Sequence, residues 1–551
     1  MQKFPPLPLH SDWVNATLKQ MTLDQKIGQL LHPCIEPSAS KAEWQQSMGQ
    51  VEPGGMFLSA GAREEFKRAT DWLQHDTAVP LIISSDLEHG AGGMIFDATT
   101  FPCTMALGAT NNPELAYEMG RAAAVEGRAL GVHWAFAPVA DVNVNPYSPG
   151  TNTMSFGDDP QRIARFANSV IRGMQENGMC ATVKHFPGCG ADDRDSHICN
   201  ILNPLSMEQW DKTYGYTFQQ AIDLGVWSVM IGHVSLPAWD MGDAHHMQSA
   251  PPATLSKRIL IDLLRQRMGF EGVIITDAMD MGGVMAFGKQ AEIVPAAIEA
   301  GCDMILFSNA DDDFRAIKQA VANGRLSSER IEESARRILA LKEMLQLHET
   351  TQAPAISTSD NEHFQVVSQQ IADTAVTLVR DWHNILPLKI APGMKILSYH
   401  LRGDADINVN KFDDLLRAYG VAVNHFNETD LGKFHKSNTF VDQYDAIILN
   451  AVFTHSWGTN RIRPAGNYMR DVWALINSHH PQLILVSYGS PYLVYDMPHM
   501  PCVINAYSPE LMMQKAVLRV LTGELEPTGT TPVNLNAPYA LKHLKGTHNI
   551  Q

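Results

Sequence analysis

Ionisable side chains stand at the ends of five short apolar runs in the first part of the chain. They are Asp86, Asp141, the adjacent pair Lys184 and His185, His233 and Asp277. Carboxylates and histidines can attack electrophilic carbon, move protons or bind the hydroxyl groups of a ligand. An aspartate at a strand end also often caps the following loop, so each aspartate taken alone has a structural interpretation. The grouping, rather than any single residue, indicates a catalytic or binding site.

The loop that follows Lys184 and His185 adds an acid/base candidate. It reads FPGCGADDRDSH and places Asp195 two residues before His197. A histidine beside a carboxylate is held in one tautomer and is stabilised when it takes up a proton, which suits general acid/base catalysis. The same richness in glycine and aspartate is typical of a mobile lid or of a solvent-exposed loop.

The elements that must position these residues follow one rhythm, in which apolar runs alternate with segments of helical spacing. The runs cover 28–34, 54–60, 80–86, 133–142, 180–186, 227–233, 272–278 and 303–309. Most lack polar/apolar alternation, as expected for parallel strands that are covered on both faces. No GxGxxG follows the first strand, which argues against an open dinucleotide-binding sheet. The pattern predicts a (β/α)8 barrel over residues 1–347, whose carboxyl-end face would gather the ionisable side chains.

A second domain is predicted beyond the barrel. The polar segment 348–363 has no apolar periodicity and is interpreted as a linker. Residues 364–551 then contain four further apolar runs with helical segments between them, at 394–401, 444–453, 482–488 and 502–507. This α/β pattern predicts a smaller domain in which helices sandwich a parallel sheet.

Composition excludes several classes of protein. Apolar residues make up 45% of the chain and charged residues 18%, so it is not mainly disordered. With 42 basic against 59 acidic residues the net charge is -17, which argues against a broad nucleic-acid surface. The chain lacks the ~18 consecutive apolar residues of a membrane helix and a recognisable secretory signal. Its seven cysteines form no CxxC pair. We therefore expect a cytoplasmic protein with reduced thiols, no metal and no cofactor.

Two long motifs carry a family resemblance. The segment KHFPGCGADDRDSH (184–197) resembles the signature loop of family 3 glycoside hydrolases, in particular their bacterial β-N-acetylglucosaminidase branch, and GVIITDAMDM (272–281) is similar to the strand that carries their nucleophile. Shorter matches follow in order along the chain: MTLDQKIGQ (21–29), PVADVN (138–143), SFGDDP (155–160) and a C-terminal segment over 506–535. The resemblance covers nearly the whole chain and implies a retaining exo-β-glycoside hydrolase of two domains.

The resemblance also implies roles for the catalytic residues. Asp277 corresponds to the nucleophile that forms a glycosyl-enzyme, and His197, oriented by Asp195, corresponds to the acid/base catalyst. These residue types suit the chemistry, because a retaining glycosidase needs an ionised carboxylate and a second group that first donates and then accepts a proton.

The remaining site candidates are expected to bind the sugar. The resemblance assigns sugar hydroxyls to Asp86 and places Lys184 and His185 in the same subsite. His233 fits the acetylglucosaminidase pattern better than the glucosidase pattern, and Asp141 is the ionisable residue near the end of the apolar run 133–142. Among the aromatic residues, Trp239 lies in a loop and is the best candidate for a wall on which a sugar ring stacks, whereas Trp134, Phe136 and Trp227 are better explained as core or as secondary candidates.

The sequence departs from the acetylglucosaminidase pattern at two places. No arginine occurs from Asp86 to Phe101, and Met154 stands where an arginine is expected before Ser155. Those arginines hydrogen-bond sugar hydroxyls, which methionine cannot do. The candidate catalytic residues are present while the expected sugar-binding arginines are absent, so a different or modified sugar is one alternative.

Four functions remain open from the sequence. The first is release of β-linked N-acetylglucosamine from a non-reducing end, and the second is β-glucosidase or another β-hexosidase activity. A glycoside phosphorylase is the third, because a histidine repels phosphate less than a carboxylate does. The fourth is a non-catalytic sugar-binding protein on the same fold. The expected partner is a small carbohydrate, and a homodimer is one of the assemblies left open.

Overall fold

The computed structural model shows two compact units. It describes residues 3–75, 77–241, 250–349, 354–403, 407–427, 441–455, 458 and 461–535. Unit 1 comprises residues 1–101, 113–142 and 160–365, and unit 2 comprises 102–112, 143–159 and 366–551. The sequence predicted an uninterrupted first domain over 1–347. In the structure two segments inside that range group with unit 2, because local patterning carries no information about which core a loop packs against.

The described part of unit 1 contains a ring of eight parallel strand positions. Its strands are β1 (Leu31–His32), β2 (Cys34–Ile35), β3 (Gly55–Leu58), β4 (Ile82–Ser85), β5 (Trp134–Ala135), β6 (Cys180–Phe186), β8 (Ser228–Ile231), β10 (Val273–Thr276) and β11 (Ile305–Leu306). Seven of them form one sheet in the order β10-β8-β6-β5-β4-β3-β2. The ring closes because β1, one residue before β2, pairs with β11, and Met304 beside β11 bridges to Ile275 of β10.

Each predicted apolar run in the first 310 residues contributes one position of this ring, which confirms the (β/α)8 barrel. Every residue of β3, β4, β8 and β10 is buried, as expected for strands covered on both faces. A short two-stranded sheet, β7 (Ile201–Leu202) with β9 (Val234–Ser235), lies outside the ring order.

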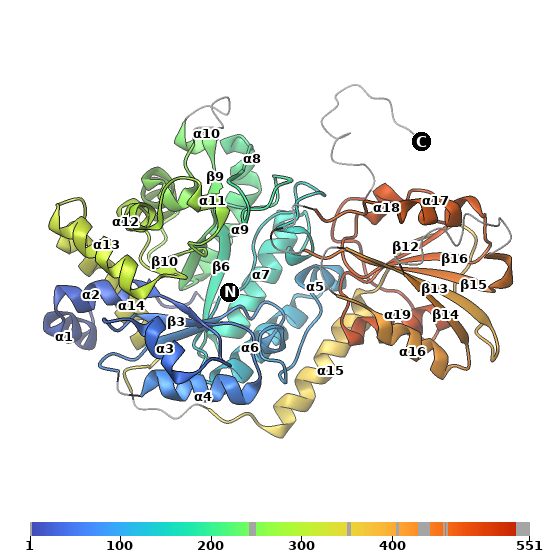
Figure 1. Ribbon diagram of the computed structural model, residues 1–551, viewed down its shortest axis with the longest axis horizontal. Coiled ribbons are helices and arrows are strands. Elements are labelled where there is room, and N and C mark those ends of the chain that lie inside the picture. The colour runs from blue at the N-terminus through green and yellow to red at the C-terminus, as the bar shows by residue number, and fades with distance from the viewer. Residues whose placement is uncertain are drawn as a thin grey trace. The chain divides into compact units, whose positions relative to one another are not determined.

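Helices alternate with the strands of unit 1 (Figure 1). They are α1 (Asp12–Gln20), α2 (Leu23–Gln29), α3 (Lys41–Met48), α4 (Arg63–Gln74), α6 (Pro113–Ala129), α7 (Pro160–Gln175), α8 (Met207–Lys212), α9 (Tyr214–Leu224), α10 (Pro237–Asp240), η5 (Arg258–Arg267), α11 (Gly282–Met285), α12 (Gln290–Ala300), α13 (Ala310–Ala322) and α14 (Ser328–Met344). Several begin at caps that the sequence supplies; Thr22 and Gln25, for example, form a reciprocal capping box at α2.

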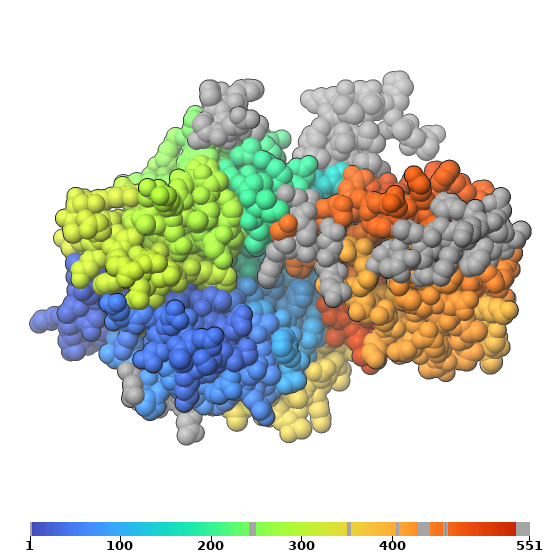
Figure 2. All heavy atoms as spheres, in the orientation of Figure 1, coloured from blue at the N-terminus to red at the C-terminus, as the bar shows by residue number. Residues whose placement is uncertain are grey.

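The two ends of the barrel sequence meet at the surface. Helix α2 packs against α13 and α14, the last helices of the barrel. The space-filling view shows the same neighbourhood, with blue N-terminal residues beside yellow-green residues from the end of the barrel (Figure 2). This contact follows from ring closure, since β1 and β11 are neighbours although more than 270 residues separate them.

Unit 2 has a six-stranded sheet in the order β12-β17-β16-β15-β13-β14. The strands are β12 (Thr377–Asp381), β13 (Lys395–Arg402), β14 (Ala422–Asn427), β15 (Ala446–Val452), β16 (Leu483–Ser487) and β17 (Cys502–Asn505). All neighbours are parallel except β12 and β17, which are antiparallel. The four runs predicted from sequence form the middle of the sheet. The edge strands β12 and β14 were not predicted, because their sequences TLVRD and AVNHFN lack a continuous apolar run.

Helices cover both faces of this sheet, which confirms the α/β sandwich. In Figure 1, α16 (Asn410–Ala418) and α19 (Leu511–Thr522) lie on one face, and α17 (Met469–Asn477) and α18 (Leu493–Asp496) lie on the other. Two separate apolar clusters fill the two layers. Helix α5 (Thr104–Thr110) comes from one of the inserted segments. Helix α15 (Thr358–Ala375) begins inside the segment that was predicted as a linker.

Two general expectations can be compared with the structure. All seven cysteines lie among the described residues and are free thiols. Among the described helices, none combines the length and the apolar character that a membrane crossing requires.

Candidate active site

Asp277 directly follows β10 on the carboxyl-end side of the barrel. Its backbone N–H donates to the carbonyl of Ile231 on β8, and its Oδ1 accepts a hydrogen bond of 2.8 Å from the N–H of Ala278. Burial raises the pKa of the Asp277 carboxyl, but the neighbouring histidines, His185 foremost, and the Ala278 hydrogen bond lower it more, so the pKa lies below its ordinary value. Asp277 is therefore held as an ionised carboxylate, the form that a nucleophile requires.

His197 and Asp195 form the dyad that their spacing predicted. The carboxylate oxygen Oδ1 of Asp195 lies 2.7 Å from Nδ1 of His197 and also accepts a hydrogen bond of 2.9 Å from the His197 backbone N–H. Asp195 is buried, whereas the side chain of His197 is 35% exposed. The carboxylate fixes the orientation of the ring and directs its Nε2 edge away from Asp195, as a general acid/base requires.

Backbone hydrogen bonds join the dyad loop to the segment after Asp277. The N–H of Gly282 donates to the carbonyl of His197 at 2.9 Å, and the N–H of Gly283 donates to the carbonyl of Ser196, also at 2.9 Å. A Cβ on Gly282 would lie 2.2 Å from the carbonyl oxygen of Ile198, so only glycine allows this approach. The charge of His197 accordingly contributes to the lowered pKa of Asp277. The structure thus brings nucleophile and acid/base candidates together across 80 residues of sequence.

Lys184 and His185 are adjacent in sequence, yet both contact acids of the site. The pairing of β6 with β8 shifts register between Val183 and Phe186, so β6 holds one residue more than its partner. Such a bulge redirects side chains that would otherwise alternate between the two faces of the strand.

Lys184 lies between two carboxylates. Its Nζ lies 3.2 Å from Oδ1 of Asp86 and 2.5 Å from Oε1 of Glu88. Burial lowers the pKa of Lys184, but the charges of Asp86 and Glu88 raise it above its ordinary value. Burial keeps the pKa of Asp86 raised, whereas the closer ammonium group brings the pKa of Glu88 below its ordinary value despite burial.

Glu88 was missed by the sequence reasoning. It lies two residues after Asp86 within the motif SSDLEHG, and that spacing was the available signal. The cluster of Asp86, Glu88 and Lys184 offers acceptors and a donor to the hydroxyl groups of a sugar.

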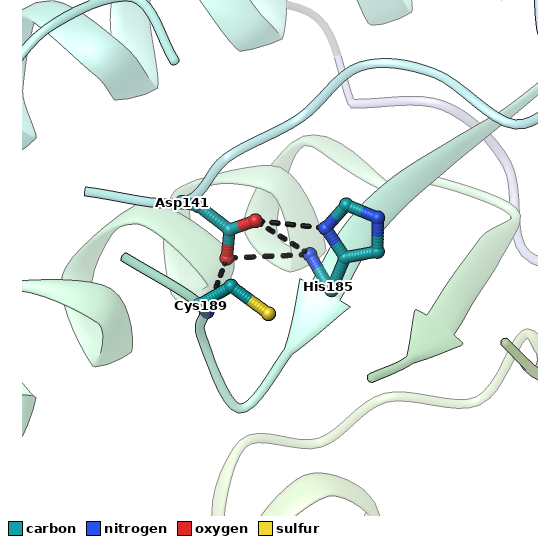
Figure 3. Close-up of side chains that lie close together, drawn as sticks. All are labelled: Asp141, His185 and Cys189. Atoms are coloured by element: carbon teal, nitrogen blue, oxygen red, sulfur yellow. Dashed lines mark hydrogen bonds and ion pairs between the residues drawn. The ribbon is translucent and has the colours of Figure 1, made fainter. Parts of the chain in front are cut away.

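Asp141 organises the start of the dyad loop (Figure 3). Its Oδ2 lies 2.8 Å from Nδ1 of His185, and its Oδ1 accepts a hydrogen bond of 2.7 Å from the backbone N–H of Cys189. Burial lowers the pKa of His185, but the hydrogen bond and charge of Asp141 raise it above its ordinary value. His185 is thereby favoured as a cation, which stabilises the Asp277 carboxylate.

Asp141, His185 and Cys189 lie close enough together to be considered as metal ligands. Their donor chemistry does not fit that role. Burial together with the charge of Asp141 raises the pKa of the Cys189 thiol well above its ordinary value. Cysteine binds a metal ion as the thiolate, so this arrangement is better suited to holding a histidine than to holding an ion.

His233 is held entirely by protein groups. Its Nδ1 lies 2.7 Å from Oγ1 of Thr254 and its Nε2 lies 2.9 Å from the carbonyl oxygen of Ala278. Burial lowers its pKa, which favours a neutral ring with the proton on Nε2. The predicted sugar contact is not what this geometry favours; His233 instead positions the residue next to Asp277.

Trp239 also has protein partners. Its indole N–H donates to the carbonyl of Arg258 at 2.9 Å, and the guanidinium of Arg267 lies 5.5 Å from its ring centre. The ring that was predicted to stack on a sugar is therefore already paired with a cation.

Met154 is buried and belongs to an inserted segment of unit 2.

The chain is similar to known proteins over almost its whole length. The family model described as "Glycosyl hydrolase family 3 N terminal domain" matches residues 22–341. A beta-N-acetylglucosaminidase/beta-glucosidase of Cellulomonas fimi is 33% identical, with 96% of this chain and 97% of that protein covered. A beta-hexosaminidase of Methylobacillus flagellatus is 34% identical over 47% of this chain and 74% of its own length.

Solved structures agree with this similarity. A beta-glucoside phosphorylase superposes with a TM-score of 0.87 at 30% identity, covering 97% of each chain. A beta-N-acetylglucosaminidase from Paenibacillus sp. str. FPU-7 superposes with a TM-score of 0.83 at 28% identity, covering 94% of this chain and 99% of that one.

Proposed function

The chain belongs to glycosyl hydrolase family 3 and is a glycoside hydrolase, and from this premise we propose that it releases one β-linked sugar at a time from a non-reducing end, with N-acetylglucosamine as the preferred sugar. The observation that carries the proposal is the arrangement around Asp277. An ionised carboxylate follows one barrel strand, and a histidine–aspartate dyad is hydrogen-bonded through its backbone to the same segment.

The two steps of the reaction assign a role to each group. In the first, the Asp277 carboxylate attacks the anomeric carbon, the glycosidic bond breaks, and His197 gives a proton to the leaving oxygen. In the second, the now neutral His197 takes a proton from water, whose oxygen attacks the anomeric carbon and releases Asp277. Because two displacements occur at one carbon, the product keeps the β configuration.

The preference for N-acetylglucosamine rests on similarity, and the residues of the subsite are compatible with it. The relatives from Cellulomonas fimi and Paenibacillus are named as acetylglucosaminidases. Asp86, Glu88 and Lys184 offer hydrogen-bonding groups to hydroxyls whether or not the sugar carries an acetamide. Glucose is therefore the second sugar to consider, in agreement with the double name of the Cellulomonas relative.

Phosphate is a second candidate acceptor beside water. The observation that favours it is the likeness to a beta-glucoside phosphorylase over 97% of both chains. A histidine acid/base is neutral after it has protonated the leaving group, so it repels a phosphate dianion less than a carboxylate would. Attack of a phosphate oxygen on the glycosyl-enzyme would give a sugar 1-phosphate in place of the free sugar.

A panel of aryl β-glycosides tests both parts of the proposal. N-acetylglucosaminide, glucoside, xyloside, galactoside and glucuronide would be incubated with and without inorganic phosphate, and the released sugar and sugar 1-phosphate would be quantified. We expect the acetylglucosaminide to react fastest. Faster turnover of another sugar would move the specificity and keep the mechanism, and sugar 1-phosphate as the main product would replace hydrolysis by phosphorolysis. Silence across the panel together with no mass increase of Asp277 after incubation with 2-deoxy-2-fluoroglycosides would reject the function.

A further inference from the structure

A group of polar side chains interrupts the apolar layer between the sheet of unit 2 and helices α16 and α19. On β13, Ser398 and His400 point to the same face because they are two residues apart. Ser398 is the register partner of His425 on β14, and His400 is the partner of Asn450 on β15. Apolar residues such as Ile396 and Ile448 occupy the rest of this face. Buried polar groups at such a place require partners, since their burial is unfavourable without them.

Asp413 of α16 lies over this polar group and joins two histidines. Its Oδ1 lies 3.2 Å from Nε2 of His400, and its Oδ2 lies 2.7 Å from Nδ1 of His425. The ring centres of the two histidines are 4.4 Å apart. One ligand atom from each of the three residues lies within 4.8 Å of the other two. Zinc ligands at bond lengths of about 2.0–2.1 Å are roughly 3.4 Å apart in a tetrahedron, so small side-chain rotations would close the site.

The hydrogen bonds within the cluster leave several buried atoms unsatisfied. Nε2 of His400 faces Ser398 Oγ at 2.9 Å and Asp413 Oδ1 at 3.2 Å, while its Nδ1 has no hydrogen-bond partner among the described residues. The same is true of Oδ1 of Asn450 and of the Tyr488 hydroxyl. His400 is only 2% exposed and Asn450 is fully buried. Hydrogen bonding alone therefore does not complete this polar group. The two imidazoles and the carboxylate, whose ligand atoms lie within 4.8 Å of one another, have the composition of a metal site.

We propose that His400, Asp413 and His425 bind a divalent transition-metal ion, Zn²⁺ in the first instance, inside unit 2. Two imidazoles and one carboxylate are ligands that zinc prefers, whereas Mg²⁺ and Ca²⁺ prefer oxygen ligands alone. Ser398 Oγ, which donates to Asp413 Oδ1 at 2.6 Å and approaches His400, stands beside the three ligands where a fourth donor or a bound water would complete a tetrahedron. The side chain of His425 is 32% exposed, so the ion has a route from solvent.

The site would fasten the edge of the sheet. Among the strands that the structure describes, β14 is the terminal one in the sheet order and pairs with β13 alone. The three ligands come from β13, α16 and β14, which lie next to one another in Figure 1. One ion bound to all three would hold the edge strand to the helix above it, which is a structural role separate from the chemistry of the barrel. Edge strands are otherwise the least restrained strands of a sheet.

Equilibrium dialysis of the full chain against Zn²⁺, with the bound metal counted by mass spectrometry, tests the proposal. Wild type is expected to hold one ion per chain at micromolar free Zn²⁺ and none of added Mg²⁺ or Ca²⁺. Asp413→Asn preserves shape but removes the anionic ligand, and His425→Ala removes the accessible imidazole; each should weaken binding by about 100-fold or more. His363→Ala is the matched control, because His363 forms an exposed contact with Glu118 at 3.0 Å in unit 1; it should bind as wild type does.

Two further measurements keep the test decisive. Zn²⁺ should raise the melting temperature of wild type and of the His363→Ala control by about 5 °C, and should leave the two ligand variants unchanged. If a variant does not fold, Co²⁺ added to wild type should give the strong visible absorption of a four-coordinate site without the sulfur-to-metal band that Cys189 would produce. No stoichiometric binding by wild type, or equal binding by both ligand variants and wild type, would overturn the proposal and leave the cluster as a hydrogen-bonded pair of histidines around one carboxylate.

Discussion

A buried carboxylate lies at each end of the barrel strands, and the two carboxylates have different kinds of partner. Asp277 follows β10 at the carboxyl end, where His185, His233 and His197 surround it and protons can be exchanged. Asp303 precedes β11 at the amino end, fully buried, with Arg265 at 2.7 Å, Arg337 at 3.1 Å and Arg330 at 3.6 Å.

The partners explain the difference. Burial raises the pKa of Asp303, but the charges of three arginines together lower it below its ordinary value, and a guanidinium does not give up its proton. Ser334 and the N–H of Ile274 satisfy the remaining lone pairs at 2.9 and 3.0 Å. Asp303 is thus a closed ion cluster that joins strand, η5 and α14. The site around Asp277 uses histidines in place of arginines, which keeps the carboxylate ionised while allowing proton transfer. The carboxyl end of the barrel is arranged for chemistry and the amino end for stability.

The largest expected effect is on the carboxyl end. Asp277→Ala should lower kcat by about 10⁴-fold or more, because it removes the carboxylate that attacks the anomeric carbon. Steady-state rates on the best aryl glycoside measure the loss. The melting temperature should stay within a few degrees of wild type, since among the described residues the Asp277 side chain forms no salt bridge and accepts a hydrogen bond only from its neighbour Ala278. Turnover that persists after contaminating activity has been excluded would remove Asp277 from the mechanism.

His197→Ala should lower kcat/KM by about 10²–10⁴-fold for substrates with poor leaving groups. The loss should be far smaller for activated aryl glycosides, whose leaving oxygen departs without protonation. A series of aryl leaving groups of graded pKa, compared between wild type and variant, measures this dependence. Equal losses across the series would show that His197 is not the acid. A matched His363→Ala variant should react as fast as wild type with every leaving group.

At the amino end of the barrel strands, Asp303→Asn should lower stability and leave activity almost unchanged, the reverse of Asp277→Ala. It leaves three buried arginines without their carboxylate, which should lower the free energy of unfolding by about 3 kcal/mol. Rates below the unfolding transition should stay within about two-fold of wild type. Denaturant unfolding and kcat measured on the same preparation separate the two effects. A lost activity with intact stability would contradict the division between the two ends.

The free energy of unfolding at acid pH also tests the difference between Asp277 and Asp303. Because the pKa of Asp303 is lower in the folded than in the unfolded state, its contribution is fully present above the unfolded pKa and is lost as pH falls through the folded pKa. Wild type should therefore lose unfolding free energy over this acid range. Asp303→Asn should lose less of it. Identical pH dependence of the two proteins would mean that the arginine cluster does not stabilise the carboxylate.

The smallest effect concerns the pH profile of the reaction. The charge of His185 is the largest influence that lowers the pKa of Asp277, so His185→Gln should raise that pKa. Asp277 must be ionised to react, and the acid limb of kcat/KM should move to higher pH by less than about one unit. His363→Gln, which changes a remote exposed histidine, should leave the limb in place. A shift to lower pH, or none, would show that His185 does not set the charge of the nucleophile.

Local sequence was a good guide where one element carried the information. The eight apolar runs predicted the barrel strands, and the Asp195/His197 spacing predicted a dyad that the structure shows at 2.7 Å. It was a poor guide where partners are distant. The sequence around Trp239 does not indicate that the Arg267 guanidinium lies over its ring. The sequence around His233 does not indicate that Thr254 and Ala278 contact its two ring nitrogens.

The sequence by itself determined the order of the barrel strands, the barrel, the second α/β unit and the residue types at the strand ends, because these follow from periodicity and short motifs. Only the tertiary structure decided which side chains meet. Ring closure brings β1 to β11, two glycines let the dyad loop reach the Asp277 segment, and the parallel sheet of unit 2 gathers Asp413 between His400 and His425. The charges that shift a pKa act over a few ångströms of space, and the number of residues between two side chains does not indicate how far apart they lie.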